Sequence, residues 1–111
     1  HYMEEAAEAD YVIVIDNGSI VAKGTPSDLK ERYTSDKLTL VAREPEALAA
    51  RLAADGFAAS VVANRVTVSI SNTLAALPLL ERYKDQFTGF TVTTGTMDEA
   101  FIAITGKEIR E

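Results

Sequence analysis

The sequence predicts an α+β protein in two parts. A β-hairpin and a helix are expected over residues 1–35, and a ferredoxin-like βαββαβ domain with one further helix over residues 36–111. Two β-branched runs joined by Asn17-Gly18 predict the hairpin, because both turn positions of such a hairpin require a positive φ. Later in the chain, segments with strand and helix periodicity alternate. The net charge also changes near residue 36, which favours two units over one.

The first part begins with an acidic segment rich in Ala and Glu, residues 2–9, which we expect to be helical. The hairpin strands are expected over residues 11–16 and 19–24. Every position from Tyr11 to Ile15 is apolar, which is typical of a strand covered on both faces. This strand therefore predicts packing neighbours beyond the sequence itself.

The next helix is predicted from its start. Thr25 is a suitable N-cap, Pro26 occupies the first helical position, and Asp28 follows three residues after the cap. Leu29 and Tyr33 share one face of this helix at i, i+4 spacing. We expect the helix to fade around residues 34–36, which serve as the linker.

The second part predicts a four-stranded antiparallel sheet with two helices on one face, because its elements follow the order β-α-β-β-α-β. Pro78 predicts either a kink in the second helix or a helix that starts there. A last helix begins at Thr96, with Glu99 in the capping-box position, and is expected to cover part of the other face of the sheet. The strands are expected over residues 37–43, 58–63, 66–71 and 88–94, and the helices over residues 44–55, 73–85 and 97–105.

Composition excludes several classes of function. Residues 1–36 hold eight acidic and three basic residues, and residues 37–111 hold nine and eight, so no basic stripe favours nucleic acid. The chain has no cysteine, one histidine and no apolar run near the roughly 20 residues that span a bilayer. It contains neither a G-x-x-x-x-G-K-[ST] phosphate loop nor a G-x-S-x-G elbow. The carboxylate pairs Glu4/Glu5 and Asp98/Glu99 are expected on solvated helix faces.

Both ends of the chain resemble one family. His1-Tyr2-Met3-Glu4-Glu5-Ala6, followed by the hairpin and by Gly24-Thr25-Pro26, resembles the stretch after the catalytic machinery of ABC ATPases. The segment 96–106, TMDEAFIAITG, is similar to the ending of ATP-binding subunits from drug-exporter and ABC-2-type systems, with Met97 and Ala100 as mild departures. The chain is thus identified as a C-terminal fragment of an ABC transporter ATP-binding protein.

The resemblance implies specific roles. His1 would be the switch histidine that contacts the γ-phosphate, in the full-length protein alone, because the Walker and signature motifs are not in this sequence. ATP and Mg would bind the parent protein and not this fragment, which should not hydrolyse ATP. Residues 1–35 would be the remnant of the nucleotide-binding domain and residues 36–111 an accessory, regulatory domain.

The expected partners are the nucleotide-binding domain of the same chain, a transmembrane permease subunit and a dimer mate, with no nucleic acid and no direct membrane insertion. The expected location is cytoplasmic, peripheral on the inner face of the cell membrane. The alternative for the second part is a small-molecule-sensing, ACT-like regulatory domain, an idea that fold analogy alone suggests.

Overall fold

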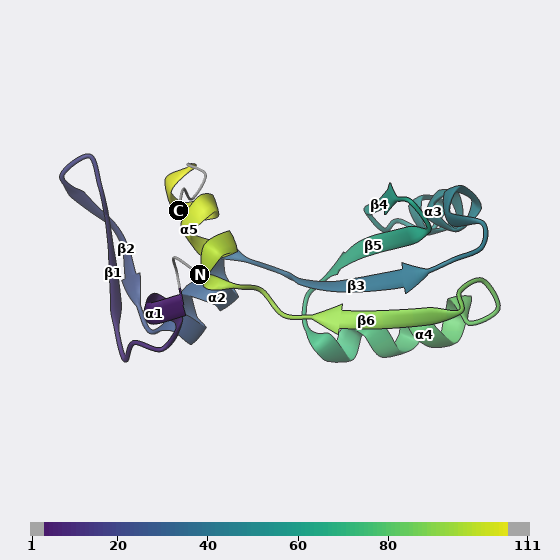
Figure 1. The fold of residues 1–111 in the computed structure, drawn as a ribbon, viewed down its shortest axis with the longest axis horizontal. Coiled ribbons are helices and arrows are strands. Elements are labelled where there is room, and N and C mark those ends of the chain that lie inside the picture. The colour runs from purple at the N-terminus through teal and green to yellow at the C-terminus, as the bar shows by residue number, and fades with distance from the viewer. Residues whose placement is uncertain (1–3, 107–111) are drawn as a thin grey trace. The chain divides into compact units, whose positions relative to one another are not determined.

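The computed structural model describes residues 4–106 and divides the chain into two compact units (Figure 1). Unit 1 is discontinuous, since it comprises the residues up to Thr34 and those from Gly95 onward. Unit 2 is the continuous segment Ser35–Thr94 between them. The fold class is α+β with two antiparallel sheets, as the sequence predicts.

Unit 1 is a two-stranded hairpin with helices packed on it. Its elements are α1 (Glu4–Ala7), β1 (Val12–Asp16), β2 (Ser19–Gly24), α2 (Pro26–Tyr33) and α5 (Met97–Thr105). Asn17 (φ 52°) and Gly18 (φ 80°) both adopt left-handed backbone angles, which confirms the predicted turn. The register shifts at Val14/Ile15, so β2 carries one extra residue opposite β1.

Unit 2 has the element order β-α-β-β-α-β and one four-stranded antiparallel sheet in the order β4-β5-β3-β6. The connection from β5 begins with a short 3₁₀ turn, Thr73–Ala75. The other elements are β3 (Asp36–Val41), α3 (Pro45–Ala54), β4 (Ala59–Val62), β5 (Arg65–Ile70), α4 (Ala76–Tyr83) and β6 (Gly89–Thr93).

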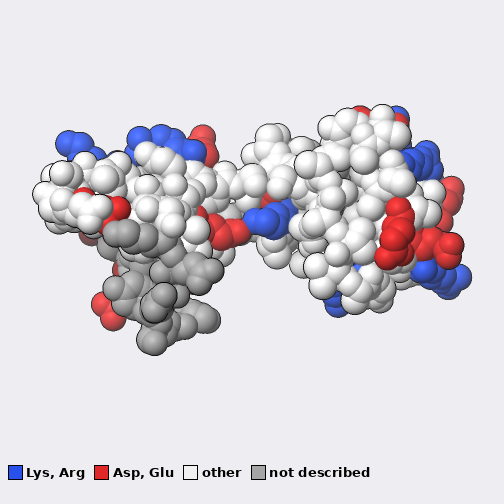
Figure 2. All heavy atoms as spheres, turned by 90° about the horizontal axis from the view of Figure 1, so that it is seen from above, with Lys and Arg blue, Asp and Glu red and all other residues white. Residues whose placement is uncertain are grey.

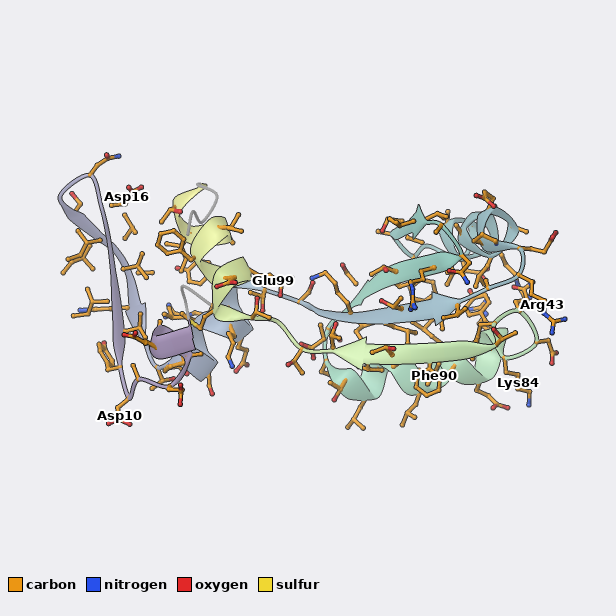
Figure 3. The ribbon with its side chains drawn as sticks, viewed as in Figure 1. Asp10, Asp16, Arg43, Lys84, Phe90 and Glu99 are labelled. Carbon is orange, nitrogen blue, oxygen red and sulfur yellow. The ribbon has the colours of Figure 1, made fainter. Side chains whose placement is uncertain are left out.

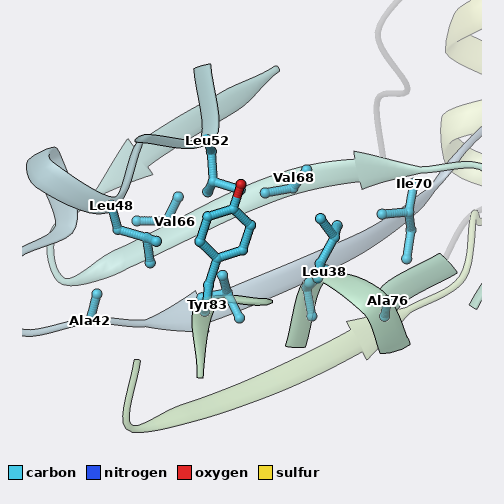
Figure 4. Close-up of a cluster of buried hydrophobic side chains, with 11 residues drawn as sticks. Leu38, Ala42, Leu48, Leu52, Val66, Val68, Ile70, Ala76 and Tyr83 are labelled. Carbon is cyan, nitrogen blue, oxygen red and sulfur yellow. The ribbon is translucent and has the colours of Figure 1, made fainter. Parts of the chain in front are cut away.

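Both helices of unit 2 cover the same face of the sheet. Alternate strand residues, among them Leu38, Leu40 and Val68, are fully buried beneath Leu52 of α3 and Tyr83 of α4 (Figure 4). The opposite face carries hydroxyl side chains, which follow from the alternation of the strands. There Thr39 and Thr67 face each other across β3 and β5, with their Oγ1 atoms 3.2 Å apart.

The last helix differs from the sequence-based expectation. Residues 97–105 were expected on the free face of the four-stranded sheet, within a domain of residues 36–111, but α5 belongs to unit 1. Met97 (3% exposed) and Ala100 (0%) pack in one cluster with Leu29 of α2. The physical reason is that the free face of the sheet is rich in threonine, whereas the hairpin and α2 offer apolar surface to an apolar helix face.

Pro78 lies near the start of its helix but is not its first residue. The side chain of Asn72 accepts a hydrogen bond from the backbone N–H of Ala75 (3.1 Å) and begins the 3₁₀ turn, after which α4 starts at Ala76. Pro78 is thus the third residue of α4. It is tolerated because the first backbone N–H groups of a helix have no partner within the helix.

Candidate functional site

The site residue predicted from the sequence, His1, lies outside the described residues, as does part of the motif that follows it. The part of the family-like segment that the structure describes is the hairpin, the turn into α2, and helix α5. Of the two carboxylate pairs, Glu99 acts as a helix cap, since it accepts a hydrogen bond from the backbone N–H of Thr96 (2.9 Å).

The turn from β2 into α2 is held by reciprocal hydrogen bonds. The backbone N–H of Asp28 donates to Thr25 Oγ1 (3.1 Å), and the backbone N–H of Thr25 donates to Asp28 Oδ2 (3.4 Å), which together form a capping box. Arg32 Nη2 donates to the carbonyl oxygen of Lys23 (2.8 Å). A Cβ at Gly24 would lie 3.1 Å from Arg32 Nη2, so glycine permits this close approach. The Gly-Thr-Pro segment thus fixes the hairpin against its helix.

The two faces of the hairpin differ. Its inner face, with Val14 and Ala22, is buried against α2 and α5. Its outer face carries four large apolar side chains that are more than half exposed: Tyr11 (56%), Ile13 (52%), Ile15 (64%) and Ile20 (61%). We call these four residues the outer hairpin face.

The outer hairpin face is continuous across the two strands, because Ile15 and Ile20 are cross-strand partners. Asp10 and Asp16 lie at the two ends of β1 (Figure 3). Contiguous exposed apolar surface of this kind marks an interaction site. The sequence predicts a first strand covered on both faces, and the described residues of unit 1 cover only one of them.

Unit 2 contains a polar cluster at the C-terminal end of α3. The hydroxyl of Tyr83, which is 1% exposed, donates to Asp55 Oδ2, and Asp55 Oδ1 lies 3.2 Å from Arg82 Nη2. The guanidinium of Arg51 lies over the Tyr83 ring, 5.0 Å from its centroid. Burial, and then the hydrogen bond to Asp55, raises the pKa of Tyr83 above its usual value. These contacts fasten α4 to α3 and present no reactive group to solvent.

At one end of unit 2 the surface is hollowed. The hollow has a volume of about 450 Å³ and is lined by residues of two segments, 43–48 and 85–88. The sequence analysis did not identify it, because neither segment carries a motif and the two are far apart in the chain. Arg43 and Lys84 mark this end in Figure 3, and acidic and basic side chains lie together there in Figure 2.

The described residues contain neither a group of metal-ligating side chains nor a membrane-spanning helix. No group of three or more His, Cys, Asp or Glu side chains within residues 4–106 could hold a metal ion. The whole sequence contains no phosphate-binding loop of the G-x-x-x-x-G-K-[ST] type. No helix in the described part of the chain is long and apolar enough to cross a membrane.

Comparison with known proteins gives two informative matches, and no family model matches the chain. The sequence is 29% identical to the daunorubicin resistance ATP-binding protein DrrA3 of Streptomyces coeruleorubidus over 98% of this chain. It is 59% identical to the energy-coupling factor transporter ATP-binding protein EcfA1 of Clostridium novyi (strain NT) over 29 residues, 26% of this chain. The matches span 37% of the first relative and 10% of the second. At the level of the family, the chain is related to the ATP-binding subunits of ABC transporters.

Proposed function

We propose that this chain is the C-terminal part of the ATP-binding subunit of an export-type ABC transporter and is inactive alone. The outer hairpin face carries the proposal, because four large apolar side chains are exposed in the segment that most resembles the family. In the longer protein, the rest of the nucleotide-binding domain would cover this face. The similarity to DrrA3 supports the same proposal, because it extends over 98% of this chain but over 37% of the relative.

Each unit then has a separate role. Unit 1 closes the nucleotide-binding domain, and unit 2 forms most of the accessory domain that supports or regulates ATP-driven transport. We assign His1 the role of switch histidine in the longer protein only. ATP and Mg bind to residues outside this chain, and the partners are the nucleotide-binding domain, a permease subunit and a dimer mate. The proposed location is the inner face of the cell membrane, through the transporter complex.

The coding sequence upstream of His1 tests this proposal first. It should encode a phosphate-binding loop about 150 to 200 residues earlier, since about one domain is needed to complete an ATPase. The longer protein should hydrolyse ATP, a His1→Ala variant of it should lose turnover, and the 111-residue chain should show none. An upstream sequence without such a loop, or ATP turnover by the 111-residue chain that His1→Ala removes, would contradict the proposal.

A comparison of the same substitution in the short and long chains tests the outer hairpin face directly. Ile15 is 64% exposed, so Ile15→Thr in the 111-residue chain should change the free energy of unfolding by less than about 0.5 kcal/mol. In the longer protein the side chain would be buried, and the same change should cost more than about 1 kcal/mol. Val14→Thr, at a position 5% exposed, is the matched control and should destabilise both chains. Equal effects of Ile15→Thr in both chains would contradict a covered face.

A second candidate for unit 2, small-molecule sensing, is favoured by one observation. The hollow of about 450 Å³ is within the size range of small-molecule sites, roughly 300–1,000 Å³. Sensing and regulation are compatible, because a ligand bound to the accessory domain could adjust the ATPase cycle. Thermal-shift measurements with metabolites and with the separate nucleotide-binding domain distinguish the two roles. Stabilisation by a metabolite alone favours sensing, and stabilisation by the domain alone favours an interaction role.

A further inference from the structure

Strand β6 forms one edge of the sheet of unit 2. The order β4-β5-β3-β6 gives it β3 as a neighbour on one side, and no described residue of unit 2 pairs with its other side. Proteins usually protect such an edge with charged side chains, proline or a bulge. The strand Gly89–Thr93 contains no charged residue and no proline, and it pairs with β3 in an unbroken register. The edge is therefore able to pair with another strand.

The hydrogen-bond pattern of the sheet shows which backbone groups of β6 face that edge. The backbone N–H of Ala42 donates to the carbonyl oxygen of Asn64 (2.8 Å), so the even-numbered residues of β3 bond to β5. Because successive strand residues direct their backbone groups to opposite edges, the odd-numbered residues of β3 bond to β6. Their register partners are the odd-numbered residues of β6, which bond back to β3. The backbone N–H and C=O groups of Phe90 and Val92 consequently point outward.

These outward groups match those of a second copy of the same strand. When two β6 strands pair antiparallel about a two-fold axis at Thr91, Phe90 of each strand lies opposite Val92 of the other. Residues opposed in this way exchange both of their backbone hydrogen bonds, so the outward groups of both strands are satisfied. Aromatic and β-branched residues also form favourable cross-strand pairs. The sequence of β6 is thus complementary to itself about its central residue.

Apolar side chains border the same edge. Phe90 is 54% exposed although it lies on the helix-covered face of the sheet, and its ring stacks on that of Phe87 with centroids 6.2 Å apart (Figure 3). Helix α3 packs on β4 and β5, which leaves α4 over the β6 half of the sheet (Figure 1). Arg82 of α4 points to α3, with Nη2 3.2 Å from Asp55 Oδ1, and Leu77 (61% exposed) lies on the opposite flank of α4. Leu77 and Phe90 are therefore apolar surface that a second copy would cover.

The charges near this edge also favour a second copy. The flank of α4 that carries Leu77 holds Glu81 and Lys84, which form an ion pair (3.2 Å), so the edge has no net charge that would repel its like. From the symmetric register, the apolar border and the balanced charge, we propose that unit 2 forms a homodimer in which two β6 strands join the sheets into one. A contact of this size is at the small end of specific interfaces, so the dissociation constant should lie between roughly 10 μM and 1 mM. The proposal stands on unit 2 alone and does not depend on the transporter function proposed above.

Sedimentation equilibrium of the 111-residue chain, up to about 1 mM, tests the proposal and should show a monomer–dimer equilibrium. Thr91 is exposed and would face its own copy at the two-fold axis. Thr91→Lys and Thr91→Glu should therefore each weaken dimerisation by about tenfold or more, because like charges would be directly opposed. An equimolar mixture of these two variants should restore it, because the introduced charges are then opposite. A chain that is monomeric at about 1 mM, or a mixture that associates no better than either variant, overturns the proposal.

Ser60 gives a matched control for the charge variants. It lies in the same cross-strand row as Thr91, through Thr67 and Thr39, but on the opposite edge strand, β4. Ser60→Lys should leave dimerisation unchanged, and so should Ile15→Thr on the outer hairpin face. Association that either of these changes abolishes, and that Thr91→Lys does not, would place the contact on β4 or on the hairpin and refute the proposal.

A cross-link locates the two-fold axis. The chain has no cysteine, so Thr91→Cys introduces a single thiol. Opposed residues of a pair without hydrogen bonds have Cα atoms about 4.5 Å apart, which is within the range of a disulfide. Under mild oxidation Thr91→Cys should form a covalent dimer at least about tenfold faster than Ser60→Cys, while circular dichroism shows that both variants are folded. Equal rates would refute the register. A strand of another protein on β6 would instead leave the chain monomeric and Thr91→Cys without a cross-link, which overturns the proposal.

Discussion

The contact between Thr34 and Gly95 provides a sharp test of how unit 1 is built. The chain leaves unit 1 after Thr34 and returns to it at Gly95. A Cβ at Gly95 would collide with Oγ1 of Thr34 and lie 2.6 Å from its Cβ, distances that real Cβ atoms do not show. Thr34 cannot move aside freely, since its backbone N–H (3.0 Å) and its Oγ1 both donate to the carbonyl oxygen of Lys30. Gly95→Ala should therefore lower the free energy of unfolding of unit 1 by about 1–3 kcal/mol.

The partner substitution separates this collision from other effects of the added methyl group. Thr34→Gly removes the three atoms nearest to the new Cβ. It also costs stability by itself, because it loses the hydrogen bond from Oγ1 to the carbonyl oxygen of Lys30 and loosens the backbone. The double variant should therefore be more stable than the sum of the single effects predicts, with a coupling energy of about 1–3 kcal/mol. Gly89→Ala is the control, because the nearest atom to its Cβ is Val41 Cγ2 at 3.9 Å.

Urea unfolding followed by circular dichroism gives these free energies, and amide hydrogen exchange assigns the loss to a unit. Protection should fall at Leu29 and Ala100 in unit 1 and be retained at Leu40 in unit 2. A change for Gly95→Ala within about 0.3 kcal/mol, or additive single effects in the double variant, would show that the two residues are not in contact.

Three further predictions concern unit boundaries, a strained turn and a buried tyrosine. Excision of residues 35–94, with Thr34 joined to Gly95 by two glycines, should leave α2 and α5 packed, and a collapse of amide protection in α5 would contradict this. Ala63 has a left-handed φ of 54°, so Ala63→Gly should raise the free energy of unfolding by about 1 kcal/mol, seen as a higher urea midpoint. An unchanged midpoint would show that Ala63 is not strained. Tyr83→Phe should cost about 1 kcal/mol at pH 7 through the lost hydrogen bond to Asp55. The pKa of Tyr83 is raised in the folded state, so the wild type should lose stability as pH rises above about 10, where the unfolded tyrosine ionises. The phenylalanine variant should lack this part of the decline.

Local signals in the sequence predicted most elements correctly. Asn17-Gly18 predicted the hairpin, and Thr25 and Thr96 predicted the starts of α2 and α5, where both capping boxes form. The alternation of Val66 and Val68 with polar residues predicted which face of β5 is buried. Each of these features depends on residues within one or two turns of each other, so single-sequence reasoning can reach it.

The features that could not be predicted depend on residues far apart in the chain. The apolar face of α5 indicates that the helix is buried but not which surface it packs against. Its pattern was therefore compatible with both the free face of the sheet and α2. The hollow has the same origin, because its two lining segments, 43–48 and 85–88, are brought together by the antiparallel pairing of β3 with β6. No sequence motif indicates that these two segments lie close together. The position of Pro78 in its helix was misjudged because a 3₁₀ turn capped by Asn72 precedes α4, so that α4 begins two residues before Pro78.

The two capping boxes explain why unit 1 can be discontinuous. α2 begins at Thr25 and α5 at Thr96, each with its own reciprocal side-chain and backbone hydrogen bonds, so neither helix needs the intervening residues to set its start. Unit 1 requires that the chain leave it and return to it at neighbouring points. Thr34 and Gly95, the residues on either side of unit 2 in the sequence, are close together. Unit 2 has its own buried core and shares no buried residue with the cluster of unit 1. Thr34 is the C-cap of α2 and Gly95 directly precedes Thr96, the N-cap of α5, so a substitution that separates Thr34 from Gly95 should affect both helices of unit 1.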